Sequence, residues 1–210
     1  MVGNRVIATF DGPKSVGKST LIGLLGPSLE TRGLKVWTIV EKEVVPTAIS
    51  RRLEDLYAEF RRSPGQQADQ AIAQALLEAR LWISQNLLAE VDADIVLLDR
   101  WYPSDTVFRR FLDPIKVVEA NLSAGVLVPD IVFAVTCEPE TSWGRAIARS
   151  RGLDSKVVSS FDEHQEVTRR FVAAAEKYGW DIVRTDDHGA EELAKLISSR
   201  LNQISLARNK

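Results

Sequence analysis

The residues with the clearest chemical potential lie near the start of the chain, where residues 12–19 read Gly-Pro-Lys-Ser-Val-Gly-Lys-Ser. This segment fits the pattern G-x-x-x-x-G-K-S/T, whose glycines let backbone N–H groups turn inward around an anion. Lys18 is placed to reach the β- and γ-phosphates of a nucleotide, and Ser19 to ligate Mg²⁺. The sequence therefore predicts a site for ATP with Mg²⁺. The candidate cofactor-binding residues of the loop are Gly12, Pro13, Lys14, Ser15, Val16, Gly17, Lys18, Ser19 and Thr20.

A second group that could do chemistry is the pair Asp99-Arg100, which follows the apolar run 95–98. A carboxylate at the end of a buried strand beside a phosphate loop can hold Mg²⁺, usually through water. The guanidinium next to it offers a planar fork for a phosphate or a carboxylate. A surface salt bridge is the alternative, but the position after a buried strand favours a functional pair.

A third group is rich in arginine. Arg145 and Arg149 share a helix face at i, i+4, and Arg151 follows beside Gly152. One interpretation is a solvated basic face. The other, which we favour, is a short lid over about residues 145–158 that closes over the donor phosphates and neutralises their charge.

The elements that must position these groups can be predicted from apolar patterning. We expect strands at 6–10, 35–40, 95–98, 131–135 and 181–183. We expect helices from residue 20, at 47–61, at 70–88, from 138 into the arginine-rich stretch, at 161–178 and at 191–201. Short apolar strands alternating with helices indicate an α/β protein, with a five-stranded parallel sheet and helices on both faces.

In such a sheet, ligands gather at the carboxyl ends of the strands. The residues that follow the predicted strands should therefore meet at one edge, although they are distant in the sequence. These residues are Gly12, Glu43, Asp99, Arg100 and Thr185.

Length and composition set limits on the class of protein. The 210 residues suit one domain, which includes the lid, and 45% apolar with 27% charged residues is typical of a globular protein. A net charge of −2 gives no support to nucleic-acid binding. No apolar stretch approaches the length of a membrane span, so we expect no membrane partner and a cytoplasmic location. A homodimer is left open.

The motifs together resemble those of the thymidylate kinase family. Asp99-Arg100-Trp101, followed by Ser104 and Phe108, is similar to the Asp-Arg-Tyr-x-x-Ser segment of that family. The other matching segments fall in the expected order over nearly the whole chain: 11–20, 79–80, 128–130, 138–140, the arginine-rich stretch and 161–162. The resemblance implies a three-layer P-loop NTPase fold and an ATP-dependent nucleotide kinase that acts in nucleotide metabolism.

The resemblance also implies roles for individual residues. Arg100 would bind the 5′-phosphate of the acceptor nucleotide, Arg80 would line the acceptor pocket, and Glu43 would lie near the acceptor. Trp101 could form a wall of that pocket, because it follows Arg100. The substrate-binding candidates are Glu43, Leu76, Arg80, Arg100, Trp101 and Ser104. The donor side would be completed by Arg145, Arg149, Arg151 and Thr185, and the metal would be held by Ser19 and Asp99.

Two positions depart from the family pattern, and both concern the acceptor. Lys14 stands where the family usually has an acidic residue that hydrogen-bonds the sugar hydroxyl, and an ammonium can only donate. Leu76 stands four residues before Arg80, where a phenylalanine usually stacks on thymine. The residues predict ATP use more firmly than they predict thymidylate as the acceptor.

The favoured hypothesis is phosphoryl transfer from ATP to a nucleoside monophosphate, with Lys18, Asp99, Arg100, Arg149 and Glu43 as the candidate catalytic residues. An alternative is a kinase for a hydroxyl acceptor, such as a deoxynucleoside, a modified nucleotide or a modified nucleobase in DNA, with Glu43 or Asp99 as the base. A nucleotide-dependent switch is a third hypothesis, but the chain lacks an Asn-Lys-x-Asp segment for reading guanine.

Overall fold

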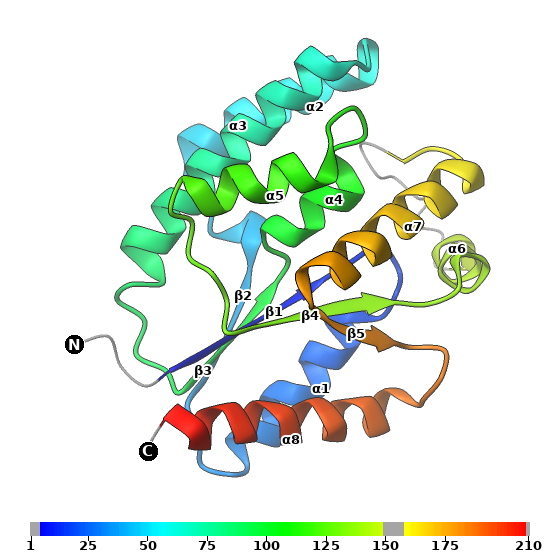
Figure 1. Ribbon diagram of the computed structural model, residues 1–210. Coiled ribbons are helices and arrows are strands. Elements are labelled where there is room, and N and C mark those ends of the chain that lie inside the picture. Colours follow the sequence, from blue (N-terminus) through cyan, green and yellow to red (C-terminus); the bar gives the residue numbers. More distant parts are fainter. Residues whose placement is uncertain (1–4, 149–157, 209–210) are drawn as a thin grey trace.

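The structure is a computed structural model that describes residues 5–148 and 158–208 (Figure 1). Its centre is a five-stranded sheet with the order β2-β3-β1-β4-β5, and every pairing is parallel. The strands are β1 (Val6–Asp11), β2 (Val36–Val40), β3 (Ile95–Asp99), β4 (Ile131–Thr136) and β5 (Asp181–Arg184). The predicted strands are confirmed, each to within one residue at either end.

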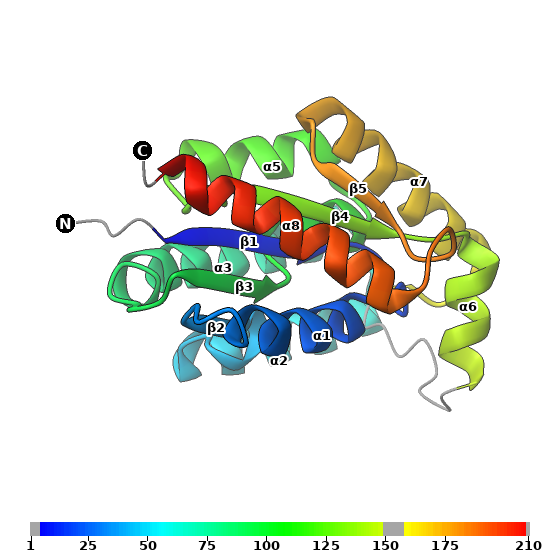
Figure 2. The same ribbon diagram turned by 90° about the horizontal axis from the view of Figure 1, so that it is seen from below.

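Helices cover both faces of the sheet, which gives the three layers predicted from the sequence (Figure 1, Figure 2). Helices α1 (Lys18–Glu30) and α8 (Ala190–Arg208) lie together on one face. The opposite side carries α2 (Thr47–Arg62), α3 (Gln66–Trp82), α4 (Asp105–Phe108), α5 (Pro114–Ser123) and α7 (Phe161–Tyr178). Helix α6 (Pro139–Ala148) lies beyond the carboxyl end of β4.

The central strand β1 is buried along its whole length, and its side chains point alternately into two separate cores. Val6, Ala8 and Phe10 enter the core beneath α1 and α8, whereas Ile7 enters the core on the other face. Burial on both faces explains why the strand is a continuous apolar run instead of an alternating one.

The helix predictions hold best where local signals mark both ends. The prediction of 161–178 coincides with α7, because the Ser160 hydroxyl accepts from the Glu163 N–H at the start and Gly179 adopts a left-handed conformation at the end. The prediction of 70–88 started four residues late, since α3 begins at Gln66, and its end lies within one residue of Leu87, where a π-helical turn of residues 83–87 ends the helical segment. Among the described residues, no helix is long and apolar enough to cross a membrane.

Helix α5 was missed by the sequence analysis, although its start carries a local signal. The Asp113 carboxylate accepts hydrogen bonds from the N–H groups of Ile115 at 2.8 Å and Lys116 at 3.3 Å. Pro114 occupies the first helical position, where its missing N–H costs nothing. Asp-Pro before an apolar periodic run is therefore a helix start that could have been recognised.

Gly12, the first residue of the phosphate loop, is held by two separate constraints. Its φ of +140° lies in a region that side chains rarely adopt, and a Cβ at this position would lie 2.1 Å from the carbonyl oxygen of Val135. The start of the loop therefore runs directly against β4, and only glycine permits this approach.

We predict that Gly12→Ala destabilises the protein by about 2 kcal/mol or more, because backbone strain adds to a clash with main-chain atoms. The measurement is the free energy of unfolding in urea. Gly23→Ala is the matched control: apart from its chain neighbours and the backbone of its own helix, no atom of the described structure lies within 4 Å of its added Cβ, so this helical substitution should stabilise by about 1 kcal/mol. Equal effects of the two substitutions would contradict the conclusion that position 12 requires glycine.

Candidate active site

The phosphate loop connects β1 to α1 and is closed from outside by the turn after β5. The Thr185 hydroxyl donates to the carbonyl oxygen of Val16 at 2.7 Å. Gly17 has a φ of +102°, and its α-carbon faces the Thr185 side chain. Because Gly17 is the N-cap of α1 and has no capping side chain, the first turn of that helix suits a phosphate. Thr185 thus reaches the loop, as the sequence predicted.

The Lys18 ammonium is buried inside this loop. Its Nζ donates to the carbonyl oxygens of Pro13 at 2.6 Å and Gly12 at 3.1 Å. Burial, followed by the nearby charge of Arg100, holds the pKa of Lys18 well below its ordinary value. A polyphosphate would supply the negative charge that this buried cation lacks.

The two predicted metal-binding residues lie side by side. The Ser19 hydroxyl donates to Asp99 Oδ2 at 3.0 Å, and the pair is open to solvent. A hydroxyl and a carboxylate are hard oxygen donors, and Mg²⁺ typically combines one or two such groups with waters and phosphate oxygens. The donor set therefore fits Mg²⁺ beside a bound triphosphate.

Arg100 lies directly beside the phosphate loop. Its Nη1 donates to the carbonyl oxygen of Gly12 at 2.9 Å and to Ser104 Oγ at 3.3 Å, and its guanidinium lies 4.8 Å from the centre of the Phe108 ring. Burial lowers the pKa of Arg100 below its ordinary value, and an arginine so placed remains cationic. The site therefore presents a second cation next to Lys18.

Asp11 belongs to this site but was treated by the sequence analysis only as the boundary of the loop. It is fully buried, and its carboxylate accepts hydrogen bonds from Thr9, Trp101 and Ser104. Burial raises the pKa of Asp11 to about 6, although the hydrogen bonds from Ser104 and Thr9 act against this shift. An ionisable residue ending a buried strand is the signal that could have identified it.

Arg80 is surrounded by carboxylates of the protein itself. Its Nε donates to Glu41 Oε1 at 2.6 Å, its Nη2 donates to Asp105 Oδ1 at 3.2 Å, and its Nη1 donates to Asp105 Oδ2 and, at 3.3 Å, to Asn121 Oδ1. Burial alone would lower the pKa of Arg80, but the two carboxylates outweigh it and raise the pKa. Only 1% of Arg80 is exposed, so this side chain ties η1 (Glu41–Glu43), α3, α4 and α5 together.

The structure differs from the sequence analysis at one acceptor candidate. Glu43 is exposed and its place near the acceptor stays a prediction, while Glu41 turns inward to Arg80. The prediction that Trp101 forms a wall of the acceptor pocket was wrong: its side chain is fully buried in the core, and its indole N–H donates to the carbonyl oxygen of Leu127 at 2.9 Å. Leu76 is half-buried against the core between α2 and α3.

The arginine-rich segment is described only in part. Arg145 on α6 donates to the Thr185 hydroxyl at 3.1 Å and to the Thr185 carbonyl oxygen at 3.4 Å, which places it on the donor side of the site. Arg149 and Arg151 lie outside the described residues. Within the loop, Lys14 is half-buried and Thr20 is exposed.

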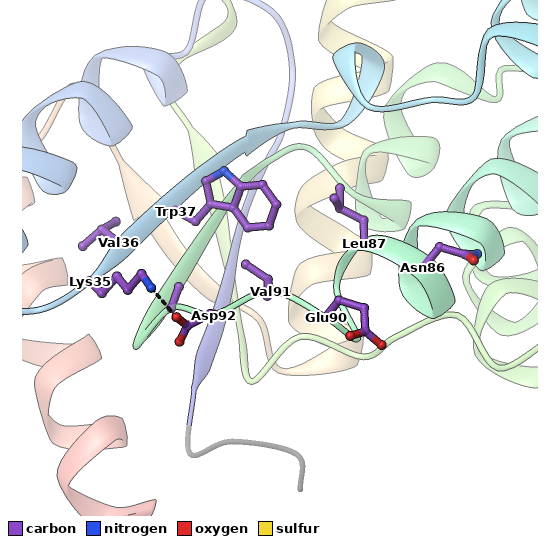
Figure 3. Close-up of a pocket in the computed structure, with 9 residues that line it drawn as sticks. Lys35, Val36, Trp37, Asn86, Leu87, Glu90, Val91 and Asp92 are labelled. Atoms are coloured by element: carbon purple, nitrogen blue, oxygen red, sulfur yellow. Dashed lines mark hydrogen bonds and ion pairs between the residues drawn. The ribbon is translucent and has the colours of Figure 1, made fainter.

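A cavity of about 420 Å³ lies elsewhere in the molecule, at the amino ends of β2 and β3 (Figure 3). Trp37 of β2 and the apolar side chains of Leu87 and Val91 contribute to its lining, and Lys35 pairs with Asp92 at its rim. Because the phosphate loop follows the carboxyl end of β1, this cavity is at the opposite end of the sheet from the candidate active site.

A parallel sheet whose first strand leads through a glycine loop into a helix, with a Ser–Asp pair and a buried lysine at that turn, defines a phosphate-loop nucleotide-binding enzyme. The family model for thymidylate kinase matches residues 10–197. The chain belongs to the thymidylate kinase family. It is therefore an ATP-dependent nucleotide kinase that phosphorylates a nucleoside monophosphate.

Individual relatives agree with this assignment over most of their length. The thymidylate kinase of Gloeobacter violaceus is 27% identical over 206 residues, which cover 93% of this chain and 95% of the relative. That of Bacillus cytotoxicus is 26% identical over 207 residues, covering 93% and 98%. That of Chlorobium chlorochromatii is 28% identical over 174 residues, covering 80% and 76%.

We predict that Arg80→Met destabilises the protein by about 3–5 kcal/mol, because it leaves Glu41 and Asp105 buried without their cation. The measurement is the urea-induced unfolding free energy at pH 7. Arg52→Met, which removes an exposed partner of Glu78, is the matched control and should change stability by about 0.5 kcal/mol or less. A similar small effect at Arg80 would refute the structural role.

Proposed function

We propose that the protein transfers the γ-phosphoryl group of ATP to thymidylate, with Mg²⁺ bound, and releases ADP and the nucleoside diphosphate. The observation that carries this proposal is the convergence of Lys18 and Arg100 on one carbonyl oxygen, that of Gly12. One cation belongs to the loop that holds the donor and the other follows the neighbouring strand. This closeness supports the proposal that Lys18 binds the donor phosphates and Arg100 the acceptor phosphate, side by side as phosphoryl transfer requires.

Each residue has a defined task in this proposal. Arg100 holds the acceptor phosphate so that one of its oxygens faces the γ-phosphorus, and Lys18 stabilises the charge that develops on the γ-phosphoryl group. A bond forms between the acceptor oxygen and the γ-phosphorus as the bond to the β–γ bridging oxygen breaks. The acceptor oxygen is already nucleophilic, so no general base is needed. Ser19 and Asp99 would hold Mg²⁺, which would further neutralise the phosphate charge.

In this proposal, Arg145 and Thr185 complete the donor side. Arg149 and Arg151 lie outside the described residues, and their role as lid arginines that would cover the transferring group stays a prediction from the sequence. The homodimer and the cytoplasmic location stay predictions from the sequence.

Thymidylate is proposed as the acceptor because the family match spans nearly the whole chain. Lys14 and Leu76 are the positions at which this chain departs from the family pattern, so they are the first candidates for any difference in acceptor preference. The alternative of a hydroxyl acceptor gains no support: Asp99 already accepts from Ser19, and Glu43 is exposed.

The first test is an assay of ADP release with Mg²⁺-ATP and a panel of acceptors: thymidylate, other nucleoside monophosphates, nucleosides and oligonucleotides. We expect thymidylate to give the highest kcat/KM. Lys18→Ala should lower kcat about 100-fold or more, because it removes charge stabilisation in the transition state. Lys35→Ala, which changes a lysine at the opposite end of the sheet, should retain full activity. Turnover with nucleosides but not with monophosphates would overturn the proposal.

A second test separates the two halves of the site. Arg100→Ala should raise the KM of the acceptor or lower kcat by about tenfold or more, while ATP binding measured by calorimetry stays within about twofold. Arg169→Ala is the control, since Arg169 is exposed and pairs only locally with Glu166. If Arg100→Ala abolished ATP binding instead, its assignment to the acceptor would be wrong.

A further inference from the structure

The Asp11 carboxylate accepts hydrogen bonds from the turn that carries Arg100. Asp11 Oδ1 accepts hydrogen bonds from the N–H of Trp101 at 2.9 Å, the N–H of Ser104 at 3.0 Å and the hydroxyl of Ser104 at 2.6 Å. Asp11 Oδ2 accepts from the Thr9 hydroxyl at 2.6 Å. Three of these four bonds therefore link the last residue of β1 to residues that follow β3.

The turn needs this support because Arg100 is strained. Its φ of +76° is in the left-handed region, which a long L side chain rarely adopts and which persists only when its surroundings enforce it. The Arg100 N–H donates to the carbonyl oxygen of Phe10 at 3.2 Å, and the next N–H, that of Trp101, donates to Asp11. Two consecutive residues of β1 thus fix the backbone on both sides of the strained position.

The same carboxylate is also linked to the Arg100 side chain through the hydroxyl of Ser104. The Ser104 hydroxyl donates its single proton to Asp11 and so turns a lone pair toward Arg100 Nη1, which lies 3.3 Å away. Asp11 consequently orients both the backbone and the guanidinium of Arg100. It immediately precedes Gly12, whose carbonyl oxygen accepts the other hydrogen bond of Nη1.

The hydrogen bonds to Asp11 favour its charged form, although burial opposes this and raises the pKa to about 6. Three donors converge on a single oxygen, and all of them are uncharged. A carboxylate oxygen accepts such a set more strongly than an amide oxygen does. In the described part of the chain, Asp11 forms no ion pair, but its charge acts at longer range on Lys18 and Arg100 and favours the charged form of each.

We propose that Asp11 is a positioning residue for the acceptor phosphate: it fixes the turn of residues 99–104 to β1 so that Arg100 is held at a set distance from the phosphate loop. The inference rests on the proposed function for the identity of the bound acceptor, but the holding of the turn is independent of it. Asp11 acts through Arg100 and touches no substrate.

The kinetic test uses Asp11→Asn, which keeps the shape of the side chain and removes its charge. We expect the KM of the acceptor to rise about tenfold while the KM of ATP changes less than about twofold. In an Arg100→Ala background, Asp11→Asn should have less than about a twofold further effect, because the residue through which it acts is gone. Thr9→Val is the matched control, because it removes only the donor to Oδ2 and leaves the three bonds to the turn in place. Measured well above the Asp11 pKa of about 6, so that the carboxylate stays charged, it should raise the KM of the acceptor less than Asp11→Asn does.

A second variant keeps the proposal testable if Asp11→Asn fails to fold. Ser104→Ala removes only the hydroxyl between Asp11 and Arg100, and it should raise the KM of the acceptor in the same direction. Asp11→Asn and Ser104→Ala should be non-additive when combined. An equal rise in the KM values of ATP and acceptor, or full additivity with Arg100→Ala, would overturn the proposal.

An independent measurement follows the turn itself by amide hydrogen exchange. The N–H groups of Trp101 and Ser104 should exchange about tenfold faster in Asp11→Asn than in the wild type, whereas those of β4 should be unchanged. If the wild type turns over no monophosphate, the proposed function fails and the exchange rates still decide whether Asp11 holds the turn. Unchanged exchange at both residues would refute the inference.

Discussion

The active site is organised by two cations that converge on one carbonyl oxygen, Lys18 buried and Arg100 half-buried. Lys18 and Arg100 both donate to Gly12, and each has its pKa lowered by burial. Such an arrangement is unfavourable for the protein alone, because two like charges are held close together where water screens them incompletely. It becomes favourable when phosphate oxygens lie between them. The glycine at position 12, the strained backbone of Arg100 and the closing contact of Thr185 all maintain this geometry for polyanionic ligands.

The framework and the donor half of the site could be predicted because they depend on local signals and on one topological rule. Apolar runs identify strands, the glycine pattern identifies the loop, and parallel strands deliver the residues after them to a common edge. Asp99 and Ser19 were predicted to act together although they are distant in the sequence, and their side chains are hydrogen-bonded. For this pair, the position of each residue relative to a predicted strand was sufficient to predict that the two would meet.

The buried polar contacts could not be predicted, because no local signal specifies which distant charges will pair. Arg80 is bound by Glu41 and Asp105, and Asp69 pairs with Arg109 at 2.9 Å with both side chains buried. The choice of Glu41 over Glu43 depends on which way a single short helical turn faces. The residue after Arg100 illustrates the same limit: Trp101 follows a functional arginine, yet it points into the core.

The strand order has a consequence for how the protein is made. Strand β1 emerges first from the ribosome, yet its partners are β3 and β4, with Val6 beside Ile95 and Ala8 beside Ile131. The middle of the sheet therefore cannot close until more than half of the chain has been synthesised, and until then its fully buried central strand lacks both neighbours. Such distant pairing slows folding and exposes unpaired strand edges. During translation, the segment that later binds the nucleotide follows a strand that still requires protection from aggregation.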